Sequence, residues 1–277
     1  MSPTAKNRIK RFSPVQRVSH LLLMVSFLIQ GATGLSRMYF ESAWGKKLSW
    51  IFGGYESALT VHKYIGIFMI CGFLIHALYM LSKINWSNFK QSLLSPDSVL
   101  PHPRDLKEFF QHVGWFVGMS KPPEFDRWGY WEKFDYWAVF WGMNIIGITG
   151  LILAYPLVST RIMPGWGLNV CFWIHRIEAL LAMAHVFIIH FFIAHLRRHN
   201  FPMDRTMFAG SADYTAACHE KPAWIQRLKE SGELDGSLVE DAPPGLRVFH
   251  YLLGYAALVF GLFLLFGALI NTPYITW

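Results

Sequence analysis

Leu168–Leu196 reads LNVCFWIHRIEALLAMAHVFIIHFFIAHL, an almost unbroken apolar run that nevertheless carries several histidines, an arginine and a glutamate. At about 1.5 Å per residue, an α-helix of this length exceeds the roughly 30 Å of hydrocarbon in a bilayer, so its ends must project or tilt. Ionisable side chains at membrane depth are costly and are functional candidates by default. The run therefore predicts a membrane-spanning helix with a chemical role.

Four further apolar blocks have spanning length: Val18–Leu35, Val61–Leu81, Tyr136–Val158 and Leu246–Ile270. The composition agrees, because 53% of the residues are hydrophobic and only 16% are charged, against about a quarter charged in soluble domains. Mean hydropathy is +0.28. No internal repeat stands out in the sequence. We predict an all-α integral membrane protein, built as a five-helix transmembrane bundle.

The orientation follows from lysine and arginine. They gather in residues 6–17, 83–133 and 197–229, whereas the other connections hold only Arg37, Lys46, Lys47 and Arg161. By the positive-inside rule, the N-terminus is cytoplasmic and the C-terminus periplasmic, in a bacterial inner membrane. This asymmetry accounts for the formal net charge of +7, so nucleic acid is not an expected partner.

Twelve histidines are present, and seven lie within or at the edges of the apolar blocks: His20, His62, His76, His175, His185, His190 and His195. One such histidine could simply be a neutral imidazole bonded to a neighbouring helix, but seven in a small bundle weaken that interpretation. His175 and His190 are fifteen residues apart, which is about 22 Å of helical rise. A haem held by two imidazoles needs ligands from facing helices at matching depth. The spacing predicts two such levels.

The alternation of the spans assigns these levels. The second and fourth helices both run from outside to inside, so His62 and His175 lie together near the outer face. His190 lies near the inner face, where its partner is either His20 or His76. His185 and His195 lie elsewhere around the fourth helix and are interpreted as packing, propionate or quinone-side residues.

Several segments of the chain, taken together, resemble the corresponding segments of one protein family. They are Arg17-Val-Ser-His20, Val61-His62-Lys-Tyr-Ile-Gly66, the helix with His175 and His190, and Glu132-Lys133 before an aromatic third helix. Over about residues 8–200 the chain resembles the cytochrome b subunits of membrane formate dehydrogenases and thiosulfate reductases. The resemblance implies a four-helix core with two b haems, which exchanges electrons between a periplasmic iron–sulfur or c-type subunit and menaquinone near the inner haem.

Carried over residue by residue, the resemblance implies His62 with His175 as iron ligands of the outer haem, and His20 with His190 as iron ligands of the inner haem. His76 is the weaker alternative to His20. The chain departs from the pattern in its fifth helix, in the long loop before that helix, and in a His175–His190 spacing one residue longer than expected. We therefore divide it into a di-haem core (1–200), a cytoplasmic loop (201–245) and an extra helix (246–277).

The segment from His190 to Asp204 is more similar to di-haem b proteins that work beside periplasmic multihaem cytochromes c, which leaves the partner open. Arg176 could neutralise a haem propionate, with Glu178 as counter-charge, or the two could simply contact each other. Glu132 and Lys133 could contact a quinone head group or relay its protons, or be solvated charges. We expect a quinone-reactive subunit of an oxidoreductase complex, with substrate-level catalysis in partner subunits.

Another class of function stays open beside the cytochrome. Histidine-rich helices with Glu178 and Asn144 could form a metal-ion or proton transporter without haem, although the broken helices and paired half-repeats common in transporters are not evident. A passive membrane anchor would leave the paired histidines unexplained. An optical spectrum with b-type absorption on reduction separates the cytochrome from both.

Overall fold

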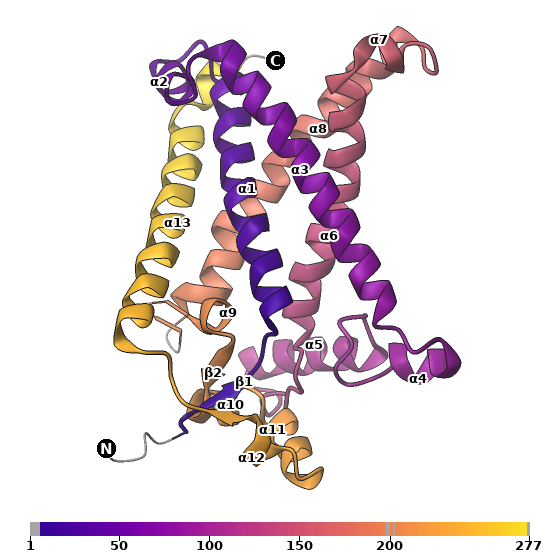
Figure 1. Cartoon of the computed structure of the whole chain (residues 1–277), viewed down its shortest axis with the longest axis vertical. Helices are drawn as coiled ribbons and strands as arrows, with labels where there is room; N and C mark the ends of the chain where they lie inside the picture. The colour runs from indigo at the N-terminus through magenta and orange to yellow at the C-terminus, as the bar shows by residue number, and fades with distance from the viewer. Residues whose placement is uncertain (1–5, 198–199, 202, 276–277) are drawn as a thin grey trace. The chain divides into compact units, whose positions relative to one another are not determined.

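The computed structural model describes residues 6–197, 200–201 and 203–275. Five of its helices are long and apolar enough to cross a membrane (Figure 1): α1 (Pro14–Met38), α3 (Tyr55–Ser82), α6 (Tyr130–Ala154), α8 with its continuation (Gly165–Leu196) and α13 (Pro244–Ile270). The predicted five spans are confirmed, with ends that shift by a few residues. The fourth extends α8 proper (Gly165–Ala184) by π-helical turns over His185–His190 (η2) and Phe192–Leu196 (η3).

Short elements fill the connections. The connection after α1 holds α2 (Ala43–Ile51), and the connection after α6 holds α7 (Pro156–Ser159). The connection after α3 holds the 3₁₀ turn η1 (Trp86–Asn88), α4 (Phe89–Leu93) and α5 (Pro103–Phe116). The segment after η3 holds α9 (Thr206–Ala209), β2 (Ser211–Asp213), α10 (Tyr214–Glu220), α11 (Pro222–Glu230), α12 (Leu234–Ser237) and β3 (Leu238–Val239), and η4 (Thr272–Tyr274) follows α13.

The chain forms two compact units. Unit 1 comprises Met1–Arg17, Tyr79–Ala138 and Arg205–His250, and unit 2 comprises Val18–Leu78, Val139–Asp204 and Tyr251–Trp277. Contacts within the units place most of every span in unit 2, and the N-terminal strand and the segments around residues 83–129 and 205–243 in unit 1. These contacts divide the chain differently from the sequence-based boundaries at residues 200 and 245.

Unit 1 contains a small sheet that the all-α prediction did not include. Strand β1 (Arg8–Lys10) lies between β2 and β3 in the antiparallel order β2-β1-β3. Behind it, Ile9 packs in a core with Trp224, Ile225 and Leu228, all nearly inaccessible to solvent. Residues 201–245, predicted as a loop, therefore contain folded elements that the N-terminal strand holds together. The alternating apolar and basic residues of such a short strand are too few for periodicity to reveal it.

In unit 2, small residues let α1 approach its neighbours closely. Ala32 and Thr33 are fully buried, and a Cβ atom added at Gly31 would lie 3.4 Å from Met183 Sδ and 3.6 Å from Leu264 Cδ1. Helix α1 thus packs against both α8 and α13, as small residues permit between membrane helices. The most apolar stretch of α3, all of it described, has no buried residue and is suited to contact lipid.

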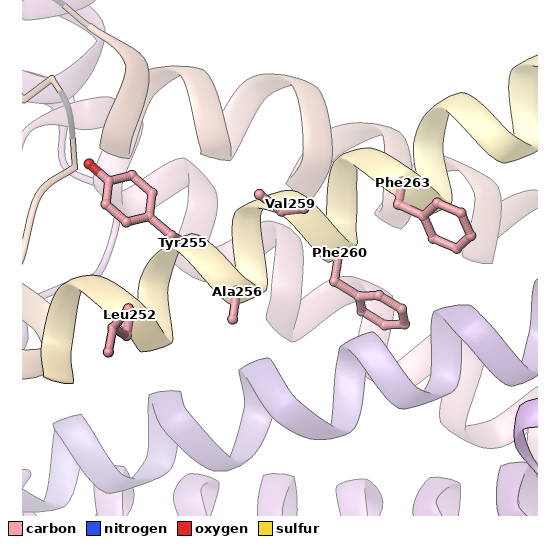
Figure 2. A pocket seen from close by; sticks show the side chains of 6 residues that line it. All are labelled: Leu252, Tyr255, Ala256, Val259, Phe260 and Phe263. Carbon is pink, nitrogen blue, oxygen red and sulfur yellow. The ribbon is translucent and has the colours of Figure 1, made fainter.

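Helix α13 packs tightly on the π-helical part of the fourth span. A Cβ atom at Gly261 would lie 2.7 Å from Phe191 Cε2 and 2.9 Å from Phe187 Cδ1. Elsewhere along α13 runs a shallow apolar groove of about 640 Å³ (Figure 2), lined by Leu252, Tyr255, Ala256, Val259, Phe260 and Phe263. Its lining suits lipid chains. One face of α13 therefore packs against protein, and another face is available for contact with lipid.

We predict that Gly261→Leu destabilises unit 2, because the new side chain overlaps the rings of Phe187 and Phe191. Overpacking of this kind costs about 1–3 kcal/mol. The measurement is the thermal-unfolding midpoint in detergent, with Ala256→Leu as the matched control on the groove face of the same helix. A midpoint that falls equally in both variants would contradict the close packing at Gly261.

Candidate haem sites

The level that the sequence predicts as the outer one is formed by His62 from α3 and His175 from α8. Their ring centroids are 6.2 Å apart with the ring planes inclined by 76°. Two imidazoles on opposite sides of one metal would have centroids about 6.3 Å apart, from a metal–nitrogen bond of about 2.0–2.1 Å and a ring radius of about 1.1 Å. The observed separation is therefore compatible with two axial ligands of one iron, and the role of this pair as ligands stays a prediction.

Each of these rings is held by a threonine on the preceding span, α1 for His62 and α6 for His175. His62 Nδ1 lies 2.9 Å from Thr33 Oγ1, and His175 Nδ1 lies 3.1 Å from Thr149 Oγ1. Both hydroxyls also lie within reach of the carbonyl four residues earlier, 2.8 Å to Ile29 and 2.7 Å to Ile145. Since a hydroxyl has one hydrogen and donates it to that carbonyl, its oxygen accepts from the imidazole. A ring that donates from Nδ1 in this way keeps a lone pair on Nε2, with which it could bind a haem iron.

The two threonines lie in a short repeat that sequence reasoning missed. Gly31-Ala-Thr33-Gly34-Leu35 on α1 corresponds to Gly147-Ile-Thr149-Gly150-Leu151 on α6. A Cβ atom at Gly34 would lie 3.4 Å from His62 Cε1, and one at Gly150 would lie 3.2 Å from His175 Cε1. The threonine thus bonds the ring while the following glycine leaves room for it. The repeat is visible in the sequence, but it is too short to stand out without the facing histidines.

Arginine side chains accompany the outer pair. Arg37, in the last turn of α1, lies within electrostatic range of His62, and its guanidinium packs 4.4 Å from the Tyr55 ring. Its Nη1 is buried and has no hydrogen-bond partner among the described residues, so it suits an anion such as a propionate. Sequence reasoning counted Arg37 only as a charge at the membrane boundary. The predicted Arg176 is buried beside His175 and lies 4.9 Å over Phe172.

The inner level gathers three histidines. His20 lies within electrostatic range of both His190 and His195, and the rings of His190 and His195 are 6.3 Å apart. His20 Nδ1 is buried with no hydrogen-bond partner among the described residues. His190 and His195 lie on one helix and cannot bind opposite sides of one iron without leaving it, whereas His20 approaches from α1. The geometry favours His20 over His76 as the partner of His190.

The π-helical turns explain the spacing of the fourth span. A π-helix bonds i to i+5 and so takes an additional residue into its turn, and such turns are frequent at functional sites. They lie at His185–His190 and Phe192–Leu196, between His175 and the end of the span. The extra residue between His175 and His190 is therefore absorbed locally. The rotations expected from an ideal α-helix do not hold for His190 and His195.

Glu132 and Lys133 belong to unit 1, where both side chains form ion pairs. Glu132 accepts from Arg11 Nη2 at 2.6 Å, from Lys221 Nζ at 2.5 Å and from the Gly129 backbone N–H at 2.7 Å. Lys133 Nζ lies 2.9 Å from both carboxylate oxygens of Asp105. Burial lowers the pKa of Lys221, and Glu132 partly offsets this. Both predicted quinone residues thus have structural partners that lie far away in the sequence.

The comparison with known proteins identifies the class. Residues 11–210, well over half of the chain, match the family model of prokaryotic cytochrome b561. The chain therefore belongs to the prokaryotic cytochrome b561 family. It is a multi-pass membrane protein that carries b-type haem and transfers electrons, which confirms the predicted cytochrome b subunit and does not favour the transporter alternative. No curated protein matches the chain. The narrower formate dehydrogenase and thiosulfate reductase resemblance stays a prediction.

We predict that Glu132→Gln destabilises unit 1, because Arg11 and Lys221, with side chains 7% and 5% exposed, lose their counter-charge. Breaking a buried pair on one side costs on the order of 3 kcal/mol. Proteolysis of the segment between η3 and α13 should accelerate in this variant. Glu230→Gln, on the exposed end of α11, is the control. Unchanged protection in both variants would show that the ion pairs do not hold unit 1 together and would leave Glu132 available for the predicted quinone contact.

Proposed function

We propose that this chain conducts electrons across the membrane through two b haems. His62 and His175 bind the outer iron, and His20 and His190 bind the inner iron, within a four-helix core of α1, α3, α6 and α8. The observation that supports this best is the 6.2 Å separation of the His62 and His175 rings, each with Nδ1 bonded to a threonine. The haems supply one-electron carriers at two depths, which span the bilayer together.

In this proposal, side chains around the outer histidine pair orient the haem ligands and neutralise the charge of the haem propionates. Thr33 and Thr149 fix the ring tautomers, while Arg37 and Arg176 offer positive charge to the outer propionates. Gln30 Nε2 donates to the His62 carbonyl at 2.8 Å, and the absence of a side chain at Gly66 gives that amide its space. These contacts hold the outer ligands in place before a haem binds, which lowers the entropic cost of binding.

We place quinone exchange at the inner level, where His195 lies beside His190 without being needed as a ligand. Reduction of a quinone such as menaquinone consumes protons, and an imidazole is suited to deliver them. A periplasmic iron–sulfur or multihaem cytochrome c subunit would exchange electrons with the outer haem. The chain then acts as the quinone-reactive subunit of an oxidoreductase complex.

We predict two haems per chain, and that His62→Ala and His175→Ala each remove the same one. His20→Ala and His190→Ala should remove the other, because the two pairs lie at different depths. Pyridine haemochrome gives the haem-to-protein ratio, and low-temperature spectra with redox titration distinguish the two haems. His76→Ala is the matched control and should retain both. Loss of different haems in the His62 and His175 variants would refute the pairing.

We predict that Thr33→Val or Thr149→Val raises the midpoint potential of the outer haem and leaves the inner one unchanged. Without the acceptor, the Nδ1–H no longer strengthens the ligand's electron donation, so the ferric state is less favoured. A hydrogen bond worth about 0.5–1.5 kcal/mol corresponds to roughly 20–60 mV for one electron. Valine keeps the shape of threonine.

The control for this shift is Thr60→Val, because Thr60 is exposed on α3 and, among the described residues, its hydroxyl donates to the Glu56 carbonyl at 3.0 Å. Its potentials should equal those of the unmodified protein. Equal potentials in the Thr33, Thr149 and Thr60 variants would show that the threonines do not act on the haem ligands.

A further inference from the structure

Helix α5 is amphipathic, and its apolar stripe faces outward. Leu106, Phe109, Phe110, Val113 and Val117 follow the i, i+3, i+4 spacing of a single helix face. Their exposed fractions run from 41% to 64%. Phe116 and Met119, at the end of the helix and just beyond it, are 70% and 83% exposed. In a water-surrounded protein this stripe would be the face turned to the core.

The polar face of α5 is the one packed against unit 1. Asp105 pairs with Lys133 at 2.9 Å, and His112 Nδ1 lies 3.1 Å from the Tyr130 hydroxyl, both on the first turns of α6. Glu108 is 6% exposed and accepts from Arg104 Nε at 2.7 Å. Burial raises the pKa of Glu108, which Arg104 partly counters. Specific polar contacts therefore fix which face of α5 points away.

A second amphipathic helix of unit 1 turns its apolar face inward, opposite to α5. Helix α11 buries Trp224, Ile225 and Leu228 and exposes polar side chains such as Gln226 and Glu230. Unit 1 can therefore bury an apolar helix face when water lies outside. The exposed apolar stripe is therefore specific to α5 and does not reflect poor packing of unit 1 as a whole.

We propose that the stripe of α5, together with Trp86 and Phe89 before it, lies in the bilayer interface among lipid headgroups and the upper acyl chains. The connection that carries it leaves one span at Ser82 and enters the next at Tyr130, so both its ends are held at the same membrane surface. Trp86 is 65% and Phe89 is 44% exposed, and their rings stack at 5.7 Å. Amphipathic helices with aromatic anchors bind bilayers in this manner.

The charge of this surface complements anionic lipid. Lys90, Lys107 and Lys121 are among the exposed basic residues of the same connection. Of its acidic residues, Asp105 and Glu108 are turned inward and paired, and the exposed Asp97 is paired with Arg127 and Arg227, which leaves Glu124 as a further exposed carboxylate. Basic side chains near an anionic leaflet each contribute roughly 1 kcal/mol to binding. This inference concerns unit 1 and does not depend on the haem ligands proposed for unit 2.

Spin labels in nanodiscs of phosphatidylethanolamine and phosphatidylglycerol test the proposal on the full chain. Cys71, Cys171 and Cys218 are first replaced by serine, and Phe110→Cys and Val117→Cys then place nitroxides on the stripe. Leu78→Cys on α3 reports a lipid-facing site and Glu230→Cys on α11 an aqueous one. Accessibility is measured to oxygen, which concentrates in hydrocarbon, and to a water-soluble nickel chelate.

We expect the labels at 110 and 117 to be several-fold more accessible to oxygen than to the nickel chelate, as at position 78, with the reverse at position 230. Nickel accessibility equal to that at position 230 would overturn the proposal by placing the stripe in water. Low accessibility to both reagents would also overturn it, because a second copy or another protein would then cover the stripe. Leu106→Cys replaces either variant that does not elute as a single species.

Discussion

Hydrocarbon offers no hydrogen-bond partner to an imidazole, and the arrangement of unit 2 depends on this constraint. An imidazole has two ring nitrogens, and each must be satisfied by protein or by metal when it lies at membrane depth. Thr33 and Thr149 satisfy Nδ1 of His62 and His175. The remaining Nε2 atoms belong to two rings at the separation of axial ligands. The cost of burying these histidines in hydrocarbon is thus consistent with the ligand role that we propose for them.

Helix α1 is the element that brings these requirements together. Its buried small residues allow close packing on α8 and α13, while Thr33 and Gly34 receive the His62 ring and Arg37 extends beyond it. His20 near the other end joins the inner level. One helix therefore contributes to both levels, and the distance along it fixes their separation. Helix α6 repeats the outer half of this role with Thr149 and Gly150.

The sequence allowed the spans to be predicted, because apolar run length is a local quantity, and the two histidine levels inferred from helical rise stay a prediction. It did not allow Arg11 and Lys221 to be matched with Glu132, since their pairing depends on chain segments far apart. The π-helical turns at His185–His190 escaped because the residue pattern is equally compatible with an α-helix. Strand β1 is stabilised by partners from beyond residue 210, so no local pattern reveals it.

Helix α5 shows a further limit of pattern reading. Its amphipathic spacing is plain in the sequence, yet periodicity states only that two faces differ and not which of them meets the protein. The ion pair of Asp105 with Lys133 and the burial of Glu108 settle the question through contacts with α6. Helix α11 answers it in the opposite sense with a buried Trp224. A unit that turns the apolar face of one helix inward and that of another outward meets two different environments, and lipid is the environment that we propose for the stripe of α5.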